Sequence, residues 1–327
     1  MTIRSLRPLT AAAAVVAALV APVGAQAQEK VRLLLDWGWL PYHSSFFLAQ
    51  EKGYFREAGV DATVEQGRGS NTTAILVGQG GFDMGHLNIT NATAAIAKGV
   101  PLKVVAVYQH RTSSSFVGIE GKVKLDGPKS LVGLKIGSTP GGSDGLGMSI
   151  FRRSNGIADG VLNIISLDAS AKTAALLTGQ VDVVSGDSHA YAAIVRGAGQ
   201  KPVVMELASY GVPLLGFGFA ANEAFLKAKP AAVKAVLTAS RRGMADAVAD
   251  PEGACTLIRS KVQVAGTLAQ CVDYLTGLQK LSQAPTDPAW GRTTDAQWKA
   301  LTETLKAVGE LQSDKPLSAY YTNDVLP

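Results

Sequence analysis

The residues best suited to chemistry stand in one short loop near the start of the chain. Trp37, Trp39, Tyr42 and His43 fall within seven positions, between a short apolar run and an apolar helical pattern. Their rings offer flat apolar surface, and His43 adds a group that can donate or accept a hydrogen bond. Aromatic walls with a few polar groups suit a small-ligand pocket. The alternative is that the rings only close the edge of a sheet; we interpret the loop as a ligand-binding loop.

Two polar turns ahead of helical patterns are candidate anion sites. Gly142 and Ser143 precede one helical pattern, and Thr139 stands in the same turn. Backbone N–H groups at a helix start, together with a hydroxyl, can bind an anion. Ser70 and Asn71 open another helical pattern and offer the same groups. In both places the alternative is an ordinary turn.

A repeated unit adds two further candidates. Residues 74–83 and 175–182 share the same order: a helical pattern, a Gly-Gln turn and a strand that starts around an Asp. Five residues beyond that Asp stands a polar residue, Asn88 in one half and Asp187 in the other. If the halves are two similar lobes, these residues face one shared cleft; the alternative is a coincidence of a common pattern. Asp187 could accept from an amine or a ring N–H, or cap the next helix.

The elements that must position these residues alternate between strand and helix patterns. Ser44 is the expected N-cap of the first helix. Repeated β-α alternation predicts an α/β protein with a largely parallel sheet and helices on both faces. After Gly216 only helical patterns follow, with Pro230 and Pro251 at two helix starts. This helical tail most simply packs back on the first lobe, so the chain crosses between lobes near Gly118 and near Gly216. The strands are expected at 31–37, 61–66, 82–85, 102–108, 115–119, 134–137, 161–167, 181–185 and 202–207.

Composition narrows the class of protein. The chain has 327 residues, enough for two domains, and 47% hydrophobic residues, which excludes general disorder. No basic cluster with interleaved aromatic residues occurs, so we expect no nucleic-acid partner. With four His and no ligand-type spacing, we expect no metal site. Of the histidines, His110 is a weaker binding candidate than His43, because it lacks the aromatic loop.

The N-terminus has the three parts of a secretory signal peptide. Arg4 and Arg7 form a charged start, residues 11–21 are an unbroken apolar run, and residues 25–27 read Ala-Gln-Ala. The run is too short to span a bilayer. We therefore expect cleavage of residues 1–27 and a mature protein outside the cytoplasmic membrane.

Cys255 and Cys271 stand on two helical patterns separated by a turn near Gly266. In an oxidising compartment they could form a disulfide that joins a helical hairpin. The alternative is two independent buried thiols, because the sequence does not fix the Cα separation that the bond requires.

Several stretches, in order along the chain, resemble periplasmic solute-binding proteins of ABC importers. The likeness is to the family that binds sulfonates, taurine, nitrate and thiamine-pyrimidine precursors, and it covers essentially the whole mature chain. The stretches that carry it are Ala49–Val60, Phe82–Gly85, Val132–Gly137, Gly179–Asp182 and Tyr321–Asp324.

The resemblance implies a two-lobed α/β fold, with two β/α lobes joined by two crossover strands and a helical C-terminal tail packed on the first lobe. After the signal peptide at 1–27, residues 28–117 and 218–327 would form lobe 1 and residues 118–217 lobe 2. It also implies a small anionic organic ligand in the interlobe cleft, a membrane permease as partner, a periplasmic location, no cofactor and a monomer. The ligand type stays open among a sulfonate, an aromatic carboxylate and a pyrimidine precursor.

Local matches to the branches of that family are mixed. Trp39, Pro41 and His43 look like the pyrimidine-binding branch, although Tyr42 stands where an Asn is common. Gly142-Ser143 matches a turn of the sulfonate-binding branch, but the residues that follow it differ.

An enzyme is the main alternative, since a cytosolic pyrimidine-precursor synthase shares this fold family. A leader sequence fits that role poorly, and the phosphate-loop and zinc-pair motifs are absent from the sequence. We therefore expect a binding protein without catalytic residues; a ligand sensor of the same fold is the third possibility.

Overall fold

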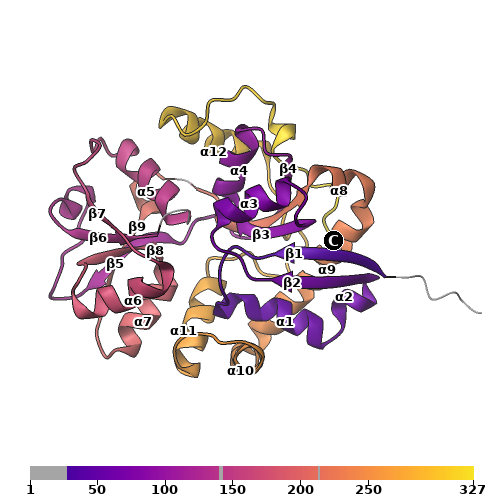
Figure 1. Ribbon diagram of the computed structural model, residues 1–327, viewed down its shortest axis with the longest axis horizontal. Helices are drawn as coiled ribbons and strands as arrows, with labels where there is room; N and C mark the ends of the chain where they lie inside the picture. Colours follow the sequence, from indigo (N-terminus) through magenta and orange to yellow (C-terminus); the bar gives the residue numbers. More distant parts are fainter. Residues whose placement is uncertain (1–27, 140–142, 213) are drawn as a thin grey trace, which may run out of the picture.

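The computed structural model describes residues 28–139, 143–212 and 214–327. It has two five-stranded sheets, each with helices against it, which lie side by side (Figure 1). The expected signal peptide at 1–27 and Gly142 lie outside the described residues. Among the helices in these ranges, none combines the length and the apolar character that a bilayer crossing requires.

The first sheet has the strand order β2-β1-β3-β10-β4. β1 pairs in parallel with β2 and β3, whereas β10 is antiparallel to both β3 and β4. The strands are β1 (Glu29–Leu34), β2 (Val60–Glu65), β3 (Met84–Asn88), β4 (Leu102–Val107) and β10 (Phe217–Asn222). The helices near them are α1 (Ser44–Glu51), α2 (Tyr54–Glu57), α3 (Ser70–Gly78) and α4 (Ile89–Ala97).

The second sheet has the strand order β7-β6-β8-β5-β9. β6 is parallel to β7 and β8, and β5 is antiparallel to β8 and β9. The strands are β5 (Ser114–Ile119), β6 (Lys135–Ser138), β7 (Asn163–Ser166), β8 (Val183–Asp187) and β9 (Pro202–Glu206). The helices are α5 (Ser143–Ser154), α6 (Ala169–Thr178) and α7 (Ser188–Gly197).

Both sheets are largely parallel, as expected, but mixed: in each sheet four strands run in one direction and one strand, β10 or β5, runs in the opposite direction. β5 and β10 are the strands by which the chain enters a new sheet, and each runs opposite to its neighbours. Apolar patterning identifies a strand but carries no information about its direction. The first passage between the sheets occupies residues 108–113, before the expected crossing near Gly118, and the second occupies residues 211–216.

The repeat seen in the sequence is a repeat in three dimensions. Asp83 accepts the backbone N–H of Arg32 at 2.7 Å, and Asp182 accepts that of Lys135 at 2.7 Å. Met84 pairs with Leu33 as Val183 pairs with Ile136. Asn88 lies four residues beyond Met84, and Asp187 lies four residues beyond Val183. They therefore occupy equivalent positions at the ends of β3 and β8. The two halves are therefore built on one plan.

The C-terminal helices pack mainly against the first sheet and its helices. They are α8 (Glu223–Ala228), α9 (Pro230–Ala249), α10 (Pro251–Lys261), α11 (Leu268–Gln279) and α12 (Asp295–Ala307). Gly243 of α9 lies against the carbonyl of Ser45, where a Cβ would clash, so α9 approaches α1 closely. Ser44 is buried at the first position of α1 and makes no capping hydrogen bond. The expected Ser44 cap is wrong, because a 3-10 turn at Pro41–His43 leads straight into the helix.

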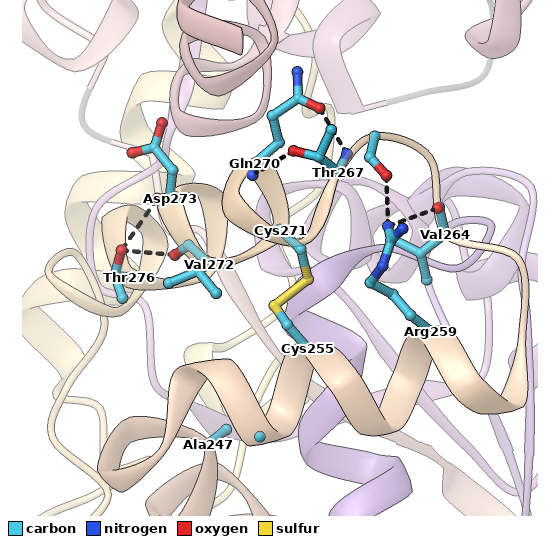
Figure 2. Close-up of a disulfide and its surroundings, with 12 residues drawn as sticks. Ala247, Cys255, Arg259, Val264, Thr267, Gln270, Cys271, Val272, Asp273 and Thr276 are labelled. Carbon is cyan, nitrogen blue, oxygen red and sulfur yellow. Dashed lines mark hydrogen bonds between the residues drawn. A yellow bond between two sulfur atoms is a disulfide. The ribbon is translucent and has the colours of Figure 1, made fainter.

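Cys255 and Cys271 form a disulfide that joins α10 to α11 (Figure 2). Their Cα atoms are 6.0 Å apart, within the range that the bond requires. The other face of α11 meets α7 of the second half. Arg196 binds both carboxylate oxygens of Asp273, at 2.8 and 3.0 Å, and Gly277 lies directly against His189. α11 thus joins the two halves of the molecule.

Candidate functional site

Asp36 is the centre of a buried polar network in the first half. It follows β1 at the carboxyl end of the strand and is 4% exposed. Its Oδ1 accepts hydrogen bonds from His43 Nε2 at 3.0 Å and His86 Nδ1 at 3.1 Å, and its Oδ2 accepts from the Tyr42 hydroxyl at 2.5 Å. A buried carboxylate is costly unless it is well hydrogen-bonded. Three donors meet that requirement here.

The neighbours of the two imidazoles indicate where their protons lie. The backbone N–H of Leu40 donates to His43 Nδ1 at 3.1 Å, so the proton of a neutral His43 is on Nε2 and points at Asp36. His86 donates from Nδ1 to Asp36, and its Nε2 accepts from the Tyr108 hydroxyl at 2.6 Å. Every polar atom of both rings is therefore engaged within the protein.

Burial and hydrogen bonding set the charges in the network. Burial by itself raises the pKa of Asp36, but the hydrogen bonds from His43 and His86 outweigh it and the net pKa is lowered. Burial lowers the pKa of His43, and it raises the pKa of Tyr42 and Tyr108 well above the usual range. At neutral pH the network contains an ionised Asp36, a neutral His43 and two protonated tyrosines.

Asp36, His43 and His86 are also the one group among the described residues whose atoms could surround a metal ion. A metal would need the lone pair of His43 Nε2, which would move the proton to Nδ1. That proton would then face the N–H of Leu40. The donor arrangement therefore fits a hydrogen-bond network and not a metal centre.

The four residues of the aromatic loop, Trp37, Trp39, Tyr42 and His43, differ in their burial. Tyr42 and His43 are buried in the network, so they support the loop and do not form an open wall as expected. Trp37 and Trp39 remain half-buried, and Trp39 packs edge-on against Phe47 with ring centroids 5.2 Å apart. Only the two tryptophans are left to offer ring surface to a ligand.

Ser70, Asn71 and Asn88 meet where α3 begins and β3 ends. The Ser70 hydroxyl accepts the backbone N–H of Asn88 at 3.1 Å, and Asn71 is exposed. The Asn88 side chain caps α4 by accepting from Thr90 at 3.0 Å and from Asn91 at 3.4 Å. Ser70 and Asn88 are thus tied to each other, and Asn71 is the residue of this group that faces solvent.

Asp187 caps α7 and is half-buried. Its side chain accepts from the Ser113 hydroxyl and from the backbone N–H of Ala190 at 2.8 Å. Burial raises the pKa of Asp187, although both hydrogen bonds lower it. Capping and ligand binding are compatible, since a carboxylate has several acceptor positions.

The remaining predicted residues fall in two places. Thr139 is buried just after β6, and Ser143 begins α5, with its side chain outside the described residues, as Gly142 is altogether. His110 lies in the first passage between the sheets, where its Nδ1 meets the Gln297 amide at 2.7 Å. His110 therefore ties this passage to α12.

Tyr274, which was not predicted as a site residue, lies between the two halves on α11. Its ring is 5.9 Å from that of Tyr42 and nearly perpendicular to it. Burial, followed by the charges of Asp187 and Asp36, raises the pKa of Tyr274 well above the usual range, so it is near both acids. Among the described residues, none hydrogen-bonds its hydroxyl. Because Tyr274 stands inside an ordinary helical pattern of the C-terminal tail, its position between the two halves could not be predicted from the sequence.

Lys172 was also missed, because it stands inside an otherwise ordinary helical pattern. Its side chain is 3% exposed, and its ammonium donates to the carbonyl of Ser185 at 2.5 Å. It also lies 5.1 Å from the centre of the Tyr191 ring. A buried cation therefore lies near the carboxyl end of β8. Asp36, His86 and Tyr108 were missed as well, and for Asp36 the end of the first strand was the available signal.

Comparison with known proteins gives a consistent picture. A family model described as NMT1/THI5 like matches residues 40–254. A 109-residue stretch is 35% identical to 4-amino-5-hydroxymethyl-2-methylpyrimidine phosphate synthase of Saccharomyces cerevisiae, covering 33% of this chain and 32% of the yeast enzyme. The matching enzyme of Aspergillus parasiticus is 28% identical over the same length. The match therefore spans about a third of the length of these relatives.

Solved structures agree over nearly the whole chain. The alkanesulfonate-binding protein of Xanthomonas axonopodis pv. citri, bound to MOPS, superposes with a TM-score of 0.70 at 17% identity, covering 91% of this chain and 99% of that one. The periplasmic nitrate-binding protein of Synechocystis gives 0.69 at 15% identity, covering 91% and 87%. At such identities the likeness concerns the fold, which is that of periplasmic binding proteins, as predicted.

Proposed function

The chain belongs to the NMT1/THI5-like family, and from this premise we propose that it is an extracytoplasmic solute-binding protein that delivers a small organic molecule to an ABC permease. The ligand would lie between the two halves. We name this region the interlobe site and assign to it Trp37, Trp39, Asn88, Asp187 and Tyr274. The proposal rests on the equivalence of the halves, which puts Asn88 and Asp187 at matching strand ends. In open α/β sheets, ligands bind at the carboxyl ends of the strands.

The chemistry of the interlobe site indicates the class of ligand. Trp37 and Trp39 offer ring surface, which suits a planar or compact organic group. Asp187 favours a donor such as an amine or a ring N–H, and the backbone N–H groups at the start of α5 favour an anionic group elsewhere on the ligand. We therefore propose an anionic organic ligand with a planar or amine-bearing part, of the pyrimidine-precursor or organosulfonate type.

A synthase-like enzyme is the second candidate, because the yeast relative is named a synthase. The Asp36 network favours binding over catalysis. Asp36 accepts three hydrogen bonds, and both nitrogens of His43 and His86 are engaged by the protein. A general acid or base has to reach a substrate proton. These residues instead support the loop that carries Trp37 and Trp39.

Native mass spectrometry of protein purified without added ligand, followed by calorimetry, tests the proposal. The panel contains pyrimidines, organosulfonates, aromatic carboxylates and nitrate. Asp187→Asn should weaken a donor-bearing ligand by about 1–2 kcal/mol, the value of one charge-assisted hydrogen bond. Asp168→Asn is the matched control, because Asp168 precedes α6 in the same half, is exposed and makes no capping hydrogen bond.

Trp39→Ala should cost more than Asp187→Asn, since it removes a ring wall. Turnover of the bound compound by purified protein would favour the synthase. Tight binding of nitrate alone, or of a neutral sugar, would contradict the proposed ligand class.

A further inference from the structure

We propose that the protein has a second binding site, for a small neutral molecule with one ring, on the far side of the Asp36 network. The site is a pocket of about 210 Å³ that is lined by α1, α9, α11 and residues 282–286 and is open to solvent at its exposed residues Val248, Ala284 and Thr286. It shares no residue with the interlobe site. The side chains that carry the argument are Tyr42, Tyr108, Met244, Val248, Leu275 and Leu278.

The cavity disfavours a charged ligand, because no charged side chain lines it and most of its polar side chains are already hydrogen-bonded within the protein. Ser282 donates to the carbonyl of Leu278 at 3.1 Å, and Gln279 donates to the carbonyl of Ala247 at 2.9 Å. The hydroxyls of Tyr42 and Tyr108 are bonded to Asp36 and His86. Of the described residues, no charged one lines the cavity. An occupant would therefore be stabilised by the burial of apolar surface.

The size of the cavity sets the size of the occupant. An engineered apolar cavity of about 150 Å³ stays dry and binds benzene. A cavity of about 210 Å³ therefore suits one ring with one or two small substituents.

The wall formed by residues 282–286 is fixed before any ligand arrives. Gln283 donates its backbone N–H to the carbonyl of Tyr108 at 2.6 Å, and its side chain bonds to Asp287 and Gly291. Arg241 donates to the carbonyl of Pro285 at 2.5 Å and to that of Asp287 at 2.8 Å. A preformed wall spares a ligand the entropy cost of ordering a loop.

Indole is the probe, titrated into the full-length mature protein and followed by calorimetry and by NMR. Ala245 lines the cavity, and Ala245→Phe should fill it and weaken indole binding at least tenfold. Ala231→Phe is the matched control, because Ala231 is exposed on the same helix and outside the cavity. The control should bind one equivalent of indole as the wild type does.

A second variant covers the case in which Ala245→Phe does not fold. Leu278→Ala enlarges the cavity and should admit 2-naphthol, which the wild type should bind at least tenfold more weakly than the variant does. The proposal is overturned if the wild type shows no saturable binding of indole, or if Ala245→Phe folds and binds it equally well. Loss of indole binding in Trp39→Ala with retention in Ala245→Phe would assign the probe to the interlobe site and also overturn the proposal.

Discussion

Reduction of the Cys255–Cys271 bond removes a cross-link between α10 and α11 without replacing any residue of the core. The two residues are 16 positions apart, and both are buried. Closing a loop of this length lowers the entropy of the unfolded chain by an amount worth about 3 kcal/mol at 25 °C. The reduced protein should therefore be less stable than the oxidised protein by about 3 kcal/mol.

Urea unfolding with and without a reducing agent measures this difference. Since the slope is about 3 kcal/mol per molar urea for a chain at the large end of the small-protein range, the midpoint should fall by about 1 M. The Cys255→Ala/Cys271→Ala variant is the control, and the reducing agent should leave its midpoint unchanged. A thiol assay first establishes that the oxidised sample has no free thiol.

A difference below about 0.5 kcal/mol in a fully oxidised sample would refute the reasoning, because it would mean that the cross-link does not restrict the unfolded chain. An equal response of the alanine variant to the reducing agent would also refute it.

The disulfide matters for binding as well, because the opposite face of α11 carries Asp273 and Gly277 against α7. Reduction should loosen that contact and weaken binding at the interlobe site.

Asp36→Asn should lower stability by about 3 kcal/mol in chemical unfolding, because it turns part of a buried acceptor into a donor that faces donors. The pKa of His43 is lowered in the folded protein, so its contribution is complete above the unfolded pKa of about 6.5 and is lost as pH falls below it; His43→Gln should reduce the acid slope by up to about 1.4 kcal/mol per pH unit. Arg196→Ala should weaken ligand binding by a factor of about 1.4 to 5 in calorimetry, since an exposed ion pair is worth about 0.2–1 kcal/mol. N-terminal sequencing of exported protein should begin within a few residues of Gln28, and an intact Met1 would contradict the expected processing.

The alternation of strands and helices, and the division into two similar halves, could be predicted because both depend on short-range patterns. The Gly-Gln turn followed by an Asp recurs in each half, and in each half the Asp bonds to the neighbouring strand. The direction of β5 and β10 could not be predicted, because it depends on the route of the chain between the sheets and not on the local residue pattern.

The Asp36 network could not be predicted, because its members come from distant positions. His86 is 50 residues and Tyr108 is 72 residues beyond Asp36. The pairing of β1 with β3 brings His86 near, and the pairing of β10 with both β3 and β4 brings Tyr108 near. Tyr42 and His43 were expected to face a ligand. Because both belong to the Asp36 network, they lie inside the protein instead. The disulfide stayed open for a similar reason, since the packing of α10 on α11 fixes its Cα separation.

The equivalence of the halves makes their chemical difference informative. At the matching strand ends the first half has Asn88 and the second has Asp187, and the second also contains the buried Lys172. A symmetric ligand would be served by equal groups on both sides, whereas unequal groups suit a ligand with two different ends. The carboxylate of Asp36 accepts hydrogen bonds from Tyr42, His43 and His86, so it supports the aromatic loop and is not available to a ligand. The charged group that selects the ligand is therefore in the second half. Exchanging the polar groups, as Asn88→Asp with Asp187→Asn, should therefore not restore binding, and calorimetry that found wild-type affinity in this double variant would refute the division of roles.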